Sequence, residues 1–152
     1  MSECDGRLPG METPRSELLA TPVRTDADVL ARVALIIDDE ARRLRALWLF
    51  FLDLDGLQNE VVVPIDCIPA RPDPQIASTV CHVVSRLLSG THEPDGTAII
   101  TLSRPGIADL SDADRHWLSA LQEGAATHNA PIRMLCLATP GGVRELGPVA
   151  AA

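Results

Sequence analysis

The chain's best candidate site is the stretch Thr-Leu-Ser-Arg-Pro-Gly at residues 101–106, followed by Ser-Asp-Ala-Asp at residues 111–114. It brings hydroxyl, guanidinium and carboxylate groups together, and a histidine follows closely. Such side chains bind metal ions or anions. The stretch lies where an expected strand ends and an expected helix begins, a frequent place for ligands in α/β sheets. The candidate binding residues are therefore Ser103, Arg104, Asp114 and His116.

This stretch resembles the site of the RadC-type branch of the JAMM (JAB) metalloprotease-like domains. In that family a strand ends with His-x-His-Pro-x-Gly, and a short loop leads to Ser-x-x-Asp at the start of a helix. The two histidines and the aspartate bind zinc, and an upstream glutamate positions the attacking water. Pro105 stands at the family's proline, Ser111 and Asp114 fall on Ser-x-x-Asp, and Gly106 lies one place early. As a pattern, the resemblance covers residues 25–147.

The two histidine positions of the pattern hold Leu102 and Arg104. Neither side chain can bind Zn²⁺, which takes histidine, cysteine and carboxylate ligands. The resemblance thus implies a domain that lacks the family's metal, so we expect no metal, no cofactor and no catalytic residue. Glu60, Ser111 and Asp114 would be remnants of the catalytic set. The function implied is that of a non-catalytic module for protein interaction or regulation.

Each remnant also has a purely structural interpretation. Ser111 and Asp114 have the spacing of a capping box, in which a hydroxyl and a later acid bind free backbone N–H groups of a helix. Glu60 is expected on a hairpin strand, facing solvent. Arg104 could bind a ligand's carboxylate or phosphate through its planar guanidinium. We favour an internal pair of Arg104 with Asp114, because both charges would otherwise lack a partner.

Two other constellations could support catalysis. Asp109, Asp114 and His116 could form a shifted ligand set for a metal-dependent hydrolase, which requires all three within about 2–2.2 Å of one point. Cys81 and His82 are adjacent residues of an expected helix and point about 100° apart. We therefore expect a buried apolar thiol and an exposed polar side chain, and not a nucleophile with its base.

The elements that position the site follow from hydrophobic periodicity and turn residues. We expect a leading helix over residues 25–44, a hairpin of strands 46–52 and 60–65, helices starting at residues 74 and 111, and strands over 97–102, 132–138 and 143–146. The order α-β-β-α-β-α-β-β predicts an α/β domain with one mixed sheet in two or three layers. This order is similar to that of JAMM and cytidine-deaminase-like folds.

The sequence predicts one folded domain between two irregular ends. Residues 1–22 carry glycines and prolines without an apolar period, which predicts a flexible N-terminal segment, and Met11 is an alternative start. Residues 23–147 are expected to form the single RadC/JAMM-like α/β domain. Residues 148–152 are expected to be a frayed tail.

The composition is globular and acidic, with 46% hydrophobic residues and a formal net charge of -8 over 152 residues. This balance argues against a nucleic-acid partner, which is bound through clustered cations. The longest strongly apolar run, residues 46–52, is far shorter than the ~20 residues of a membrane span. We expect a protein partner or self-association, with no nucleic acid and no membrane.

The location is predicted from the cysteines and the N-terminal residues, and the kind of source genome from the coding bias. Four cysteines without metal-like spacing, and no signal-peptide pattern, predict free thiols in the cytoplasm. All 13 basic residues are arginine, which together with abundant alanine and proline is typical of a GC-rich bacterial genome.

Overall fold

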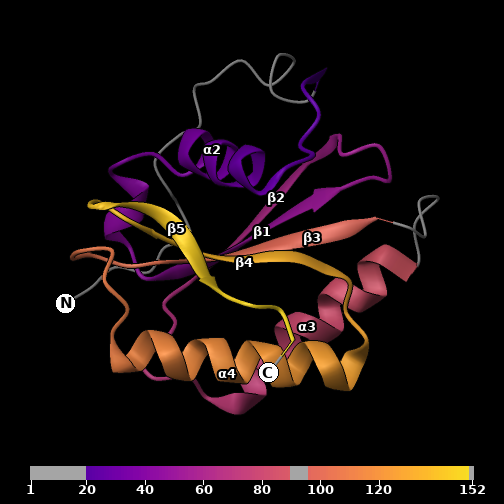
Figure 1. Cartoon of the computed structure of the whole chain (residues 1–152). Helices are drawn as coiled ribbons and strands as arrows, with labels where there is room; N and C mark the ends of the chain where they lie inside the picture. The colour runs from indigo at the N-terminus through magenta and orange to yellow at the C-terminus, as the bar shows by residue number, and fades with distance from the viewer. Residues whose placement is uncertain (1–19, 90–95, 151–152) are drawn as a thin grey trace.

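The computed structural model describes residues 20–89 and 96–150, and Figure 1 shows their arrangement. These residues form a mixed α/β domain, which confirms the predicted fold class. The described elements are, in chain order, α2 (Asp26–Ile36), the 3-10 helix η1 (Ala41–Arg43), β1 (Ala46–Leu52), β2 (Gln58–Asp66), α3 (Pro74–Ser89), β3 (Thr97–Ser103), α4 (Asp112–His128), β4 (Ile132–Thr139) and β5 (Gly142–Gly147).

The five strands form one mixed sheet in the order β2-β1-β3-β4-β5. β1 is antiparallel to both of its neighbours, β2 and β3, and β5 is antiparallel to β4. β3 and β4 run parallel, so the chain must cross over between them, and α4 lies on that crossover. The site predicted from the sequence therefore lies at the carboxyl end of β3, where the chain leaves the sheet for α4.

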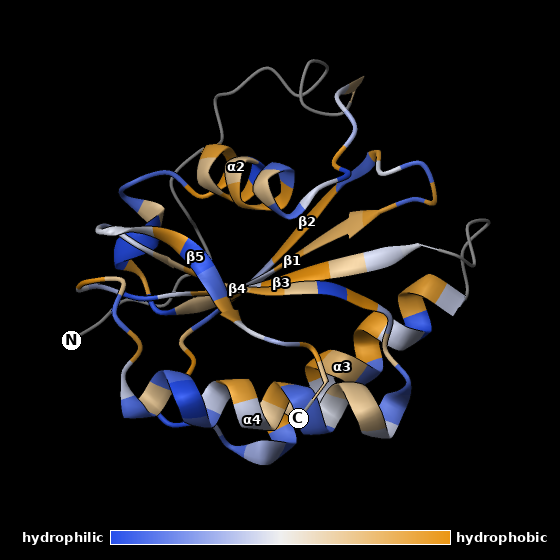
Figure 2. Ribbon diagram, viewed as in Figure 1, coloured by the Kyte–Doolittle hydropathy of each residue, from blue (hydrophilic) through white to orange (hydrophobic). Residues whose placement is uncertain are grey.

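Helices cover both faces of the sheet, which makes three layers. Figure 1 shows α2 on one side of the strands and α3 with α4 on the other. Every residue of β1 is buried, and its side chains alternate between the two faces. Leu47 and Leu49 pack towards α3 and α4, whereas Trp48 and Phe50 pack towards α2. Figure 2 shows the resulting concentration of hydrophobic residues on the strands.

The leading helix is shorter than predicted. α2 ends at Ile36, residues 38–40 are not helical, and η1 is a separate short turn, so the expected helix to residue 44 is wrong. Arg42 donates from outside α2 to the carbonyl oxygens of Ala34 and Ile37, at 2.9 and 2.8 Å. The guanidinium of Arg42 thus binds free carbonyl groups at the C-terminal end of α2, although Arg42 lies outside the helix.

The described cysteines are of two kinds. Cys81 and Cys136 are free and buried. Cys67 is disulfide-bonded, so the expectation of four free thiols is wrong.

Two further sequence expectations concern the membrane and the chain ends. Within residues 20–89 and 96–150, no helix is both long and apolar enough to cross a bilayer. The predicted N-terminal segment falls almost entirely outside the described residues.

Candidate functional site

Arg104 directly follows β3, and its backbone holds it against the neighbouring strand. Its amide donates to the carbonyl oxygen of Ala138 in β4, at 3.2 Å. The chain then turns at Gly106, where φ is +101°, a value that glycine adopts readily. A Cβ at Gly106 would lie 3.2 Å from Nη1 of Arg104. The glycine therefore lets the loop close around the guanidinium.

Arg104 and Asp114 form a buried ion pair with two parallel contacts. Nε of Arg104 donates to Oδ1 of Asp114 at 2.8 Å, and Nη2 donates to Oδ2 at 2.6 Å. The two side chains are 8% and 0% exposed. This fork geometry is the strong form of an arginine–carboxylate pair. The internal pair predicted from the sequence is confirmed.

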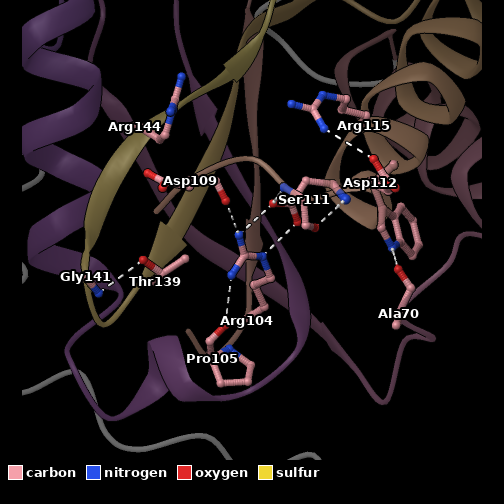
Figure 3. A network of polar contacts seen from close by, with 12 residues as sticks. Ala70, Arg104, Pro105, Asp109, Ser111, Asp112, Arg115, Thr139, Gly141 and Arg144 are labelled. Carbon is pink, nitrogen blue, oxygen red and sulfur yellow. Dashed lines mark hydrogen bonds and ion pairs between the residues drawn. The ribbon is translucent and has the colours of Figure 1, made fainter. Parts of the chain in front are cut away.

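The loop between β3 and α4 supplies two further acceptors for the guanidinium (Figure 3). Nη1 of Arg104 donates to the carbonyl oxygen of Pro105, and Nη2 also donates to that of Asp109, both at 2.9 Å. Every guanidinium nitrogen therefore has a partner within the protein, and these contacts use four of its five N–H groups.

Ser111 and Asp114 form the predicted capping box at the start of α4. Oγ of Ser111 accepts from the amide of Asp114 at 3.1 Å, and Oδ2 of Asp114 accepts from the amide of Ser111 at 2.9 Å. Oδ2 of Asp114 thus serves both the helix cap and Arg104. The carboxylate links the end of β3 to the start of α4.

The environment of Asp114 favours its charged form. Burial alone would raise the pKa of this carboxyl. Hydrogen bonds from Arg104 and Ser111, together with the positive charge of Arg104, outweigh burial and hold the pKa below its ordinary value of 3.8. Because folding lowers this pKa, the charged form stabilises the fold above the unfolded value, and that stability is lost as the pH falls through the folded value.

Replacing Asp114 with asparagine is therefore expected to change how stability depends on pH. The wild type should be much more stable than Asp114→Asn at pH 6 to 7, and the difference should shrink as the pH falls below about 4. Urea denaturation of both proteins at a series of pH values measures this difference. A difference that stays constant from neutral to strongly acidic pH would contradict the lowered pKa.

Replacing Ser111 with alanine is expected to destabilise the protein by about 0.5–2 kcal/mol, since the amide of Asp114 loses its acceptor. Urea denaturation at neutral pH measures the change. Ser119→Ala is the matched control, because Ser119 is an exposed residue inside the same helix. The control should leave stability unchanged or slightly raised, as alanine is the better helix former. Equal effects at both positions would rule out the cap.

A second guanidinium, that of Arg45, lies beside the pair. Ala46 pairs with Ser103 across the β1–β3 ladder, so the residue before β1 meets the residue after β3. Nη1 of Arg45 is buried and has no hydrogen-bond partner among the described residues. Burial, followed by the charge of Arg104, lowers the pKa of Arg45, and Asp114 acts in the opposite direction. This contact depends on the strand register and could not be predicted from the sequence.

Ser103 does not belong to this site. Its side chain points to the opposite face of the sheet, where Oγ donates to the carbonyl oxygen of Leu44 at 2.7 Å and accepts from Nε1 of Trp48 at 2.9 Å. Leu102, at the other histidine position of the family pattern, is fully buried in the core formed with α3 and α4. Both side chains are therefore part of the packed interior on the two faces of the sheet.

His116 and Glu60 also lie apart from the ion pair. His116 is exposed on α4, and its Nδ1 lies 2.7 Å from the carbonyl oxygen of Asp112. The carboxylate of Asp112 contacts Arg115 at 3.4 Å, an exposed pair. Glu60 is exposed on β2, which β1 separates from β3. The solvent-facing position expected for Glu60 is confirmed.

The residues present do not fit the zinc of the family pattern. Leu102 and Arg104 are not ligands, and both oxygens of Asp114 are engaged by Arg104. Within the described part of the chain, no three His, Cys, Asp or Glu side chains gather as a metal-binding group. Asp109, Asp114 and His116 are accordingly not brought together, and no catalytic step can be derived through a metal here.

The Cys81–His82 neighbours are arranged as predicted. Cys81 is fully buried, and burial raises the pKa of its thiol to about 11. His82 is exposed, and its ring lies 5.0 Å from that of His128. Burial likewise raises the pKa of Cys136 to about 12. Both described free thiols are therefore protonated at neutral pH and poor nucleophiles.

Compared with protein-family models, with curated proteins and with solved structures, the chain gives no match. The similarity to RadC-type JAMM domains therefore stays a prediction that rests on the residues themselves.

Proposed function

We propose that this protein is a non-catalytic binding domain with a RadC/JAMM-like layout, and that it acts by binding another protein. The observation that carries the proposal is the buried Arg104–Asp114 pair. The family pattern would use both positions as metal ligands. Here the two side chains bind each other at 2.6 and 2.8 Å and leave no ligand set behind.

The surroundings of the pair support a structural role for these residues. Asp114 caps α4, and the loop carbonyls of Pro105 and Asp109 complete the contacts of Arg104. A group that must move a proton or bind a substrate needs a free lone pair or donor facing a cleft. The pair is instead closed on itself, so the former site contributes stability and not chemistry.

We also propose that the domain comes from a bacterium with a GC-rich genome, because all of its basic residues are arginine. We place it in the cytoplasm. The disulfide of Cys67 removes the support that four free thiols would have given to this location.

Metal content and hydrolysis test the proposal together. The full chain, purified without chelators and dialysed after exposure to Zn²⁺, should retain far less than one equivalent of zinc by mass spectrometry. It should also leave a fluorogenic peptide-amide substrate intact. One tightly held zinc per chain, with hydrolysis that Asp114→Asn abolishes, would refute the non-catalytic assignment.

A double variant tests the layout itself. Leu102→His/Arg104→His restores the histidine pair of the family pattern beside Asp114. If the layout is RadC/JAMM-like, the folded double variant should bind one zinc that the wild type does not bind, since three ligands then converge. A variant with a native circular dichroism spectrum and no zinc affinity would contradict the layout.

A further inference from the structure

An apolar groove lies between β2 and α3, and neither Arg104 nor Asp114 lines it. Its volume is about 470 Å³, and its lining is mostly aliphatic. The aliphatic lining residues come from β1 and β2 on one side and from α3 on the other: Leu49, Val63, Ile65, Ile76, Val80 and Val83. Asp73 is the charged residue of the lining and lies at the start of α3.

The groove extends along α3 as exposed apolar side chains. On α3, Val83 and Leu87 are 38% and 44% exposed and continue the stripe at a helical spacing of four. Residues 76–87 of this helix span about 16 Å, which is about three turns.

These side chains are exposed because none of the described helices fully covers β2 on this face of the sheet. On this face of the sheet, α3 and α4 bury the side chains of β1, β3 and β4. β2 is an edge strand, and its residues on the same face, Val63 and Ile65, are only partly buried. One more helix beside α3 would complete the layer and remove the apolar stripe from water.

A second copy of the chain has little apolar helix surface to offer to the groove. α2 and α4 bury their apolar faces on their own sheet, α2 exposes a single large aliphatic side chain, Leu35, and the ones that α3 exposes, Val83 and Leu87, belong to the groove itself. Two copies would also bring together chains that each carry a net charge of -8. The charge of the groove, from Asp73, is likewise negative and favours a basic ligand.

We propose that the groove between β2 and α3 binds an amphipathic helix of a partner protein, with a Lys or Arg of that helix placed against Asp73. This inference rests on the proposed function and names the partner class. The partner's apolar face fills the groove between Val63 and Ile65 on β2 and Val80 and Val83 on α3. Anchors at spacings of three and four residues, over about three helical turns, fit the length of the stripe.

Selection from a displayed library of random peptides, about 12 residues long, on the immobilised full chain tests the proposal. Enriched peptides should carry apolar residues at helical spacing with a Lys or Arg at one end. Fluorescence anisotropy then measures the affinity of the best peptide. Val83→Asp should weaken binding at least about tenfold, because a charge enters the apolar contact. The matched control, Leu35→Asp, places the same charge on α2 and should leave the affinity unchanged.

Asp73→Asn tests the charge separately. Oδ1 of Asp73 accepts from the amide of Gln75, and asparagine can keep that contact. This variant should weaken the basic peptide about two- to fivefold, and the loss should disappear at high salt.

Three results would overturn the proposal: no enriched peptide, binding that Val83→Asp leaves intact, or a dimer in light scattering that Val83→Asp dissociates. The zinc and hydrolysis measurements address the Arg104–Asp114 site independently. If no peptide binds the groove, the proposal that the domain is non-catalytic is therefore unaffected.

Discussion

Replacing Arg104 with alanine is expected to lower the free energy of unfolding by about 3–5 kcal/mol. The substitution leaves the carboxylate of Asp114 fully buried without its main partner, and it frees the loop carbonyls of Pro105 and Asp109. For a chain of this size, such a loss lowers the thermal midpoint by about 6–20 °C. Urea denaturation and differential scanning calorimetry measure both quantities.

Arg115→Ala is the matched control. It removes an arginine from α4 that pairs with Asp112, and those two side chains are 61% and 84% exposed. Because exposed pairs contribute little, the denaturation midpoint should not move measurably. If Arg104→Ala were as mild as Arg115→Ala, the buried pair would not organise the loop between β3 and α4.

Replacing Trp117 with alanine is expected to cost about 3–5 kcal/mol of folding free energy. Trp117 is fully buried on α4, in the core between the helices and the sheet. Its Nε1 donates to the carbonyl oxygens of Pro69 and Ala70, at 3.2 and 3.0 Å. The side chain therefore ties the loop after β2 to the helix that carries Asp114. Denaturation in urea gives the loss directly.

Two further variants separate the contributions of Trp117. Trp117→Phe keeps most of the packing and removes the indole donor, so it should cost about 1–3 kcal/mol. Leu54→Ala removes an apolar side chain that is 73% exposed in the hairpin turn and should have no measurable effect. An alanine variant at Trp117 that unfolds no more easily than Leu54→Ala would contradict this account of the core.

The strands were predictable because their residues combine length, apolarity and clear ends. Residues 46–52 form a continuous apolar run, and the structure buries every one of them between two helical layers. The turn at residues 53–56 was marked by its acids and by Gly56, which adopts a φ of +82°. The residue types at such positions are compatible with few backbone conformations, so the hairpin could be placed from the sequence alone.

Other features depend on tertiary structure and escaped prediction. The break after Ile36 follows an apolar period that by itself would continue the helix. The burial of Arg32, which is 4% exposed and donates to Gln58 at 2.8 Å, contradicts the usual exposure of a helical arginine. The place of Arg45 next to Arg104 follows from strand register, which no local pattern reveals.

Within the candidate site, the sequence predicted which residues contact each other more reliably than it predicted on which face of the sheet a side chain lies. The capping box of Ser111 and Asp114 is local, so its spacing was sufficient. The Arg104–Asp114 pair followed from the cost of leaving two charges unpaired. Ser103 was grouped with them because it is adjacent in sequence, but neighbouring residues of a strand face opposite sides of the sheet.

In this structure Arg104 and Asp114 bind each other and not a ligand. A double-mutant cycle with Arg104→Met, Asp114→Leu and the combined variant, followed by urea denaturation, measures their coupling free energy. We expect a coupling of about 2–3 kcal/mol, with the combined variant more stable than at least one single variant. Additive losses, with a coupling near zero, would show that the two residues act independently and would contradict the claim.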